Sequence, residues 1–113
     1  MNDLENPLES YTELPTFFRD GLVKTMIANP DEEYVGKMLH IKAVQHVLAH
    51  FNEGGHTPGS FTTSLLEAFG HADVSNFYRL ETAFPEEGLA MRVAEHTGGI
   101  ELLKKIELGY FRK

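Results

Sequence analysis

The 113-residue sequence contains no cysteine, so disulfide bonds, thiolate zinc sites and a thiol nucleophile are excluded. Long apolar runs are also missing, because no stretch approaches the roughly 20 apolar residues that a membrane-spanning helix needs. The N-terminal segment MNDLENPLES is acidic and lacks the apolar core of a signal peptide. These absences predict a soluble protein of the reducing cytoplasm that has no membrane partner.

Positive charge is scarce, because 10 Lys and Arg stand against 17 Asp and Glu, and the net charge is −7. An acidic surface repels nucleic-acid phosphate over a Debye length of about 10 Å, so direct nucleic-acid binding is disfavoured. The same charge suits a basic protein partner, including one that handles nucleic acid. The sequence leaves the oligomeric state open.

Alternation of apolar and polar residues with period two, the mark of a β-strand, is absent over any useful length. Apolar residues instead recur every three or four positions, as in Phe18, Leu22 and Met26. The length suits one domain, and the 42% hydrophobic content is enough for a packed core. The sequence therefore predicts an all-α domain over residues 14–113, a compact bundle of five to six helices, preceded by a flexible acidic tail over residues 1–13.

The clearest element is a long helix over residues 30–53. Asn29 can cap its N-terminus, Pro30 suits the first helical position, and the acidic residues 31–33 complement the helix dipole. The pair at 54–55, Gly-Gly, supplies a left-handed stop. Because this helix is apolar on two sides, we expect it to lie at the centre of the bundle.

Capping residues, prolines and glycines predict further helices over residues 15–29, 57–69, 73–84, 86–97 and 100–110. We expect the apolar rows of two of these helices to face the core. The rows are Phe61, Leu65 and Phe69 in the range 57–69, and Phe77, Leu80 and Phe84 in the range 73–84.

His46 and His50 lie one helical turn apart, which is a spacing that a metal site can use, with Glu53 on the same side and His56 as a further ligand. The zinc-protease motif needs a glutamate directly after the first histidine, where this chain has Val47, so a metallohydrolase is excluded. Two surface or interface histidines are the favoured explanation, because histidine pairs at this spacing arise readily by chance in a chain with six histidines. We predict no metal and no cofactor, and metal binding by the pair stays open.

Ser60, His56, His71 and Asp73 include the residue types of a nucleophilic triad. No strained strand–turn–helix elbow surrounds Ser60, however, and a hydroxyl in the first turn of a helix is satisfied by free backbone amides. We therefore predict no catalytic residue and expect a protein that is not an enzyme.

Residues 65–81 carry the pattern of a helix-turn-helix, with a first helix to Gly70, a four-residue connection and a second helix from Ser75. The second helix would offer Ser75, Asn76 and Arg79 to bases, but Glu81 would lie beside them. One positive charge is few for phosphate contacts. A DNA-binding regulator is therefore the alternative function.

Four residues are candidates for a contact with a protein partner: Tyr78, Arg79, Tyr110 and Phe111. Tyrosine, arginine and phenylalanine are the types that anchor protein interfaces. Tyr110 and Phe111 precede two basic residues at the C-terminus, where they form either a docked end or a contact peptide.

Residues 54–88 hold two helix starts, two helix stops and a dense apolar stripe. The residues that define this block are Pro58, Gly59, Ser60, Phe61, Leu65, Ala68, Phe69, Ala72, Asp73, Asn76, Leu80, Phe84 and Pro85. This block resembles that of short phage and prophage proteins of unassigned function. The resemblance implies a mobile-element origin, an all-helical fold and a place in the host bacterial cytoplasm, and it implies no activity. We expect a small non-enzymatic protein that binds a host or phage protein.

Overall fold

The computed structural model describes residues 7–110, and over that range its regular structure is entirely α-helical. The all-α class predicted from the sequence is therefore confirmed for these residues, with eight helices in place of five to six. In chain order they are α1 (Pro7–Tyr11), α2 (Thr16–Ala28), α3 (Glu32–Met38), α4 (Ile41–His50), α5 (Ser60–His71), α6 (Val74–Ala83), α7 (Pro85–Glu95) and α8 (Gly99–Glu107).

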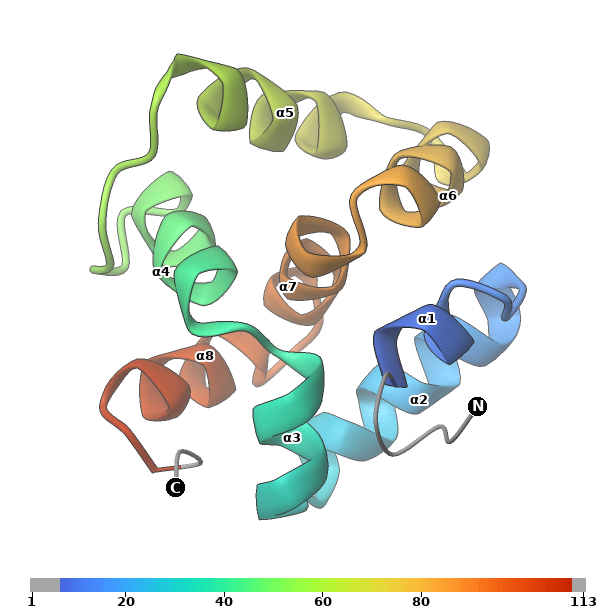
Figure 1. Cartoon of the computed structure of the whole chain (residues 1–113), viewed down its shortest axis with the longest axis vertical. Helices are drawn as coiled ribbons and strands as arrows, with labels where there is room; N and C mark the ends of the chain where they lie inside the picture. Colours follow the sequence, from blue (N-terminus) through green and yellow to red (C-terminus); the bar gives the residue numbers. More distant parts are fainter. Residues whose placement is uncertain (1–6, 111–113) are drawn as a thin grey trace.

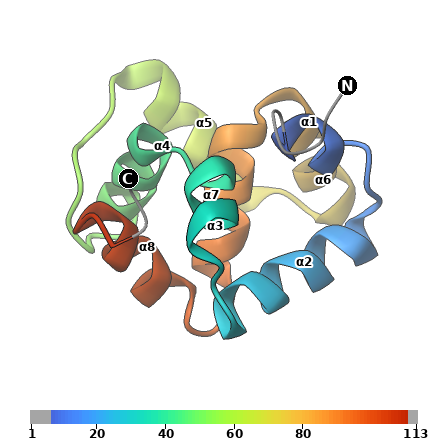
Figure 2. The ribbon, with the colours of Figure 1, turned by 60° about the horizontal axis from the view of Figure 1, so that its bottom comes forward.

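Helix α7 lies at the centre of the fold and packs against α2, α4, α5, α6 and α8 (Figure 1). Its side chains explain this position, because Leu89, Ala90, Met91 and Val93 are all fully buried. In the view of Figure 2, as in Figure 1, α4 and α8 stand on one side of α7, and α1, α2 and α6 stand on the other. None of the helices in residues 7–110 is long and apolar enough to cross a membrane.

The predicted long helix over residues 30–53 is wrong. The chain breaks it into α3 and α4 at Leu39 and His40, whose backbone is extended (φ −106°, ψ 101° and φ −75°, ψ 134°). Met38 and Leu39 are adjacent and both buried. A straight helix would point one of its two apolar stripes away from the core, whereas the break lets α3 and α4 each bury a stripe.

The predicted flexible tail over residues 1–13 is wrong for residues 7–13, and residues 1–6 lie outside the described part. Helix α1 packs against α3, and both Leu8 and Tyr11 are buried. The reason is the phenol of Tyr11, which donates a hydrogen bond to a carboxylate in the core.

The other predicted helices are confirmed with small shifts of their ends. Asp73 caps α6 as expected, since its side chain accepts a hydrogen bond from the backbone N–H of Asn76 at 2.8 Å. Pro85 occupies the start of α7, and Gly98 adopts the left-handed conformation (φ 84°) before α8. Local signals thus fixed these ends correctly.

Candidate protein-binding face

A buried carboxylate sets the orientation of α6. Glu81 is fully buried, and it accepts hydrogen bonds from the hydroxyl of Tyr11 (2.6 Å), Nη1 of Arg19 (3.0 Å) and Nη2 of Arg92 (2.7 Å). A buried charge is tolerated only when it is paired and hydrogen-bonded, and these three donors meet that condition. Glu81 therefore joins α6 to α1, α2 and α7.

The same cluster raises the pKa values of Tyr11 and Arg92. Burial raises the pKa of the Tyr11 phenol, and the charge and hydrogen bond of Glu81 raise it further, so this phenol stays neutral. Burial alone would lower the pKa of Arg92, but the hydrogen bond and charge of Glu81 outweigh it and raise that pKa. Arg19 also donates to the carbonyl oxygens of Thr12 (2.6 Å) and Leu14 (2.7 Å), so it holds the α1–α2 connection.

The buried charged residues change which side chains of α2 and α6 face the core. Phe18 shares the helical spacing of Leu22 and Met26, but Arg19 points inward beside it, and Phe18 is 58% exposed. In α6 the inward residues are Phe77 and Glu81, so the prediction that Leu80 faces inward is wrong in part, because Leu80 is only half-buried. Ion pairing therefore places apolar side chains on the surface.

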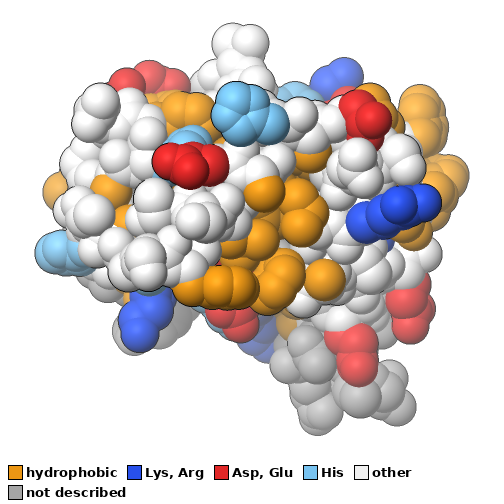
Figure 3. All heavy atoms as spheres, turned by 90° about the horizontal axis from the view of Figure 1, so that it is seen from above, with side chains coloured by type: hydrophobic (Ala, Val, Ile, Leu, Met, Phe, Trp, Pro, Cys, Tyr) orange, Lys and Arg blue, Asp and Glu red, His pale blue; other side chains and the backbone are white. Residues whose placement is uncertain are grey.

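The surface formed by α5 and α6 is apolar in its middle. We call it the α5–α6 face, and it comprises an open hollow of about 460 Å³ together with Phe61 and Phe84. The hollow is lined by Ala68, His71, Ala72, Asn76, Arg79 and Leu80. Figure 3 shows hydrophobic side chains gathered in the middle of this side of the molecule, with acidic and histidine side chains bordering them.

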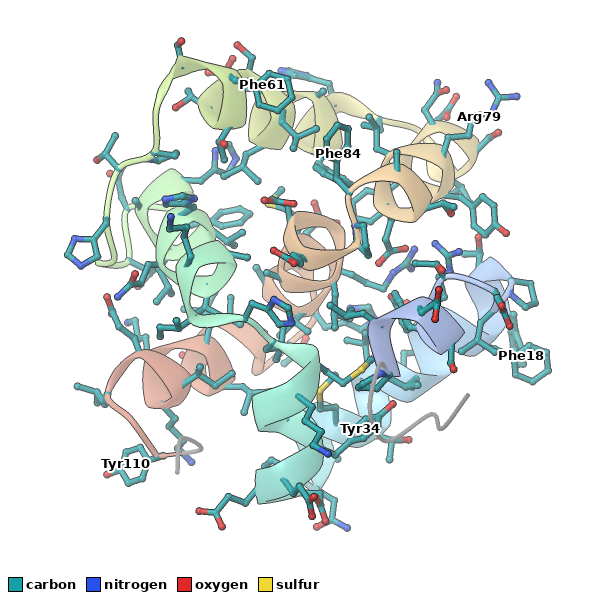
Figure 4. All side chains as sticks on the ribbon, in the orientation of Figure 1. Phe18, Tyr34, Phe61, Arg79, Phe84 and Tyr110 are labelled. Atoms are coloured by element: carbon teal, nitrogen blue, oxygen red, sulfur yellow. The ribbon has the colours of Figure 1, made fainter. Side chains whose placement is uncertain are left out.

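Two phenylalanines form one end of this face. Phe61 is 67% exposed, and its ring centroid lies 6.0 Å from that of Phe84, which is half-buried after the end of α6. Figure 4 shows the two rings close together where α5 meets the end of α6. The prediction that Phe61 and Phe84 face the core is therefore wrong for Phe61 and only partly right for Phe84.

The spacing of residues along α5 explains the hollow. Phe61, Leu65 and Ala68 recur at helical spacing along one side of α5, and Ala72 follows its last residue; of these, Leu65 is buried. Since the side chains become small towards the end of α5, the two alanines leave room that larger residues would fill. The sequence signal for this surface was the change from Phe and Leu to Ala within one row.

The four predicted partner-binding residues do not form one surface. Tyr78 is half-buried with its ring 4.2 Å from the guanidinium carbon of Arg19, so it covers a buried cation. Arg79 is exposed and lines the hollow. Tyr110 is 64% exposed and lies on the opposite side of the molecule from Arg79 (Figure 4). Phe111 lies outside the described residues.

The histidine pair is not supported by a third ligand. His46 and His50 are half-buried on α4, while Glu53 forms an ion pair with Lys104 at 2.8 Å. That contact raises the pKa of the lysine, since the Glu53 carboxylate accepts its hydrogen bond and stabilises its charge. Between residues 7 and 110 no group of three or more potential metal-binding side chains comes together.

The structure changes the predicted helix-turn-helix and separates two of the triad residues. Helices α5 and α6 are joined by two residues rather than four, and α6 exposes Ser75, Asn76 and Arg79. Glu81, which was expected beside them, is turned inward. Ser60 and His71 are the two ends of α5, so roughly 16 Å of helix separates them.

Comparisons of the chain with protein-family models, with curated proteins and with solved structures give no match. A function for this chain therefore rests on the geometry of the α5–α6 face.

Proposed function

We propose that the protein acts by binding another protein through the α5–α6 face, without catalysing a reaction. The observation that carries the proposal is the exposed ring of Phe61 beside Phe84, on the same side of the molecule as an open, partly apolar hollow. Burying a phenylalanine side chain contributes about 1.5–3 kcal/mol of favourable free energy. The isolated chain lacks much of this contribution at Phe61, and a partner that covers the ring would gain it as binding free energy.

The shape of the face favours a helix as the bound element. A groove between two helices accepts the apolar side of an amphipathic helix, whose side chains at positions i, i+3, i+4 and i+7 enter the groove. Ala68 and Ala72 line the hollow with small side chains, which leaves space for the larger residues of a partner. Polar groups at its margin, Asn76 and Arg79, can fix the orientation of the bound helix.

The proposal extends to the kind of protein that this chain represents. We place it among small acidic proteins of phage or prophage type that work in the bacterial cytoplasm and bind a host or phage protein. A basic, nucleic-acid-handling partner fits the net charge of −7. In such a complex the acidic residues of α1 and α3, outside the α5–α6 face, would meet the basic surface.

A pull-down from bacterial lysate tests the proposal. The bait is the tagged full chain, compared with Phe61→Ser and with the matched control Phe17→Ser, which removes an 80% exposed phenylalanine from α2. We expect a stoichiometric protein that the wild type and Phe17→Ser retain and that Phe61→Ser loses. Equal retention by both variants, or no retained protein, contradicts the proposal.

The alternative is a DNA-binding regulator that uses α6. The inward position of Glu81 favours it, because the outer side of α6 then presents Ser75, Asn76 and Arg79 without that carboxylate. Nucleic acid retained in the same pull-down, and lost on nuclease treatment or with Arg79→Gln, would support this alternative over protein binding.

A further inference from the structure

The charge of the hollow is opposite to the charge of the molecule. The ionisable side chains among its six lining residues are Arg79 and His71, and no carboxylate lines it. The nearest acidic residues in the sequence are Glu67, Asp73 and Glu81, and Glu81 is fully buried. Glu67 lines a separate hollow beside α4, and the carboxylate of Asp73 accepts the N–H of Asn76 as the cap of α6.

Arg79 is available for a new ion pair. It is exposed, and within residues 7–110 it forms no ion pair and no side-chain hydrogen bond. By contrast, the two other arginines in this range, Arg19 and Arg92, are both engaged with Glu81. Arg79 therefore presents an unneutralised guanidinium beside apolar surface, where an incoming carboxylate gains a charge-assisted hydrogen bond.

The apolar and cationic parts of the face are separated along α5. Phe61 lies at the N-terminal end of α5, beside Phe84, and His71 is its last residue. Ten residues of helix, roughly 15 Å, separate Phe61 from His71. A helix lying along the face would therefore place apolar side chains at the phenylalanines and in the hollow, and charged side chains near His71 and Arg79.

We propose that the segment bound by the α5–α6 face is an amphipathic helix that carries carboxylates at the end of its apolar stripe. This inference rests on the proposed function and specifies its partner. Apolar contacts at Phe61 and Leu80 provide affinity, and the pairing of Arg79 with a carboxylate selects acidic over basic sequences. The net negative charge of the whole protein favours a basic segment over an acidic one. A preference for an acidic segment would therefore come from Arg79 and the residues around it.

Two blocked synthetic peptides test the inference. Both carry the same leucine stripe on one side of a helix, with glutamates in the first and last turns of one peptide and lysines at the same positions in the other. Binding to the full chain is measured by calorimetry at low salt. We expect the glutamate peptide to bind about fivefold more tightly, as one partly exposed ion pair allows, and the preference to shrink in 0.5 M salt.

Charge reversal separates the local effect from the net charge. Arg79→Glu should invert the preference, whereas Lys105→Glu makes the same change of net charge on α8 and should leave the preference unchanged. Equal binding of the two peptides, tighter binding of the lysine peptide, or inversion by both variants would overturn the inference. If both peptides bind equally and Phe61→Ser weakens both, the acidic preference fails while the proposed binding face stands. If neither peptide binds, the inference fails, and the lysate experiment alone then decides the proposed function.

Discussion

At the scale of single residues, Glu81 determines more of this structure than any apolar side chain of α6. It lies four residues after Phe77, so both point to the same side of the helix, and that side is buried. The three donors around it come from α1, α2 and α7. One carboxylate therefore fixes the rotation of α6 about its axis. This rotation leaves Asn76 and Arg79 exposed and Leu80 half-buried.

We expect Glu81→Gln to destabilise the fold by about 3–5 kcal/mol. The amide keeps the shape of the side chain but leaves Arg19 and Arg92 buried without a negative charge between them, which is the costly way to break a buried ion pair. Urea unfolding followed by circular dichroism measures the change. Glu101→Gln, on the exposed side of α8, is the control and should change stability by less than about 0.5 kcal/mol. A comparable effect of the two substitutions would contradict the assigned role of Glu81.

The sequence contained part of this information. The spacing of Phe77 and Glu81 places them on one side of a helix, yet a glutamate is usually solvated, so the apolar neighbours Leu80 and Phe84 were expected to face inward. What the sequence could not provide was the pairing, because Tyr11 and Arg19 are 70 and 62 residues away along the chain. The exposure of Phe18 follows from the same long-range contacts, because its neighbour Arg19 is turned inward to Glu81.

At the scale of elements, the helix starts marked by Asp73 and Pro85 were predictable, whereas the break between α3 and α4 was not. The cap predicted at Asn29 is wrong, because Asp31 caps α3. Asp73 and Pro85 act on the nearest turn of their own helices, so their effect can be read from a few neighbouring residues. The break at Leu39 and His40 has neither proline nor glycine. The break depends on the core into which Met38 and Leu39 pack. The only sign of it in the sequence was that residues 30–53 are apolar on two sides.

The close approach of α6 and α7 provides a second prediction. A Cβ atom added at Gly88 would lie 2.7 Å from Cα and 2.6 Å from Cγ of Glu81, so the two helices would have to move apart. We expect Gly88→Ala to destabilise the protein by about 1–3 kcal/mol, although alanine favours a helix by up to about 1 kcal/mol.

Gly21→Ala is the matched control for this measurement. Gly21 lies inside α2, and an added Cβ atom there meets no atom within 4 Å. It should therefore stabilise the protein by about 0.5–1 kcal/mol through helix propensity alone. Thermal unfolding of the two variants gives the comparison, and a stabilising effect of Gly88→Ala would show that the α6–α7 contact is looser than described.

At the scale of the whole molecule, net charge and local charge point to different partners. The chain carries −7, which suggests a basic partner, yet the ionisable groups on the hollow are Arg79 and His71. Composition predicted the first property and could not predict the second, since the second depends on which residues of α5 and α6 the buried cluster leaves outside. The residues that form the α5–α6 face all belong to the block at residues 54–88.

The most direct test of the binding face is a map of where a ligand contacts the protein. Amide chemical shifts of the isotope-labelled chain would be followed while the glutamate-bearing amphipathic peptide is added. The account predicts that the largest changes occur at Phe61, Ala68, Ala72, Asn76 and Arg79, with α8 unaffected. Changes centred on Phe17 and Phe18 of α2, or spread evenly over the surface, would contradict it.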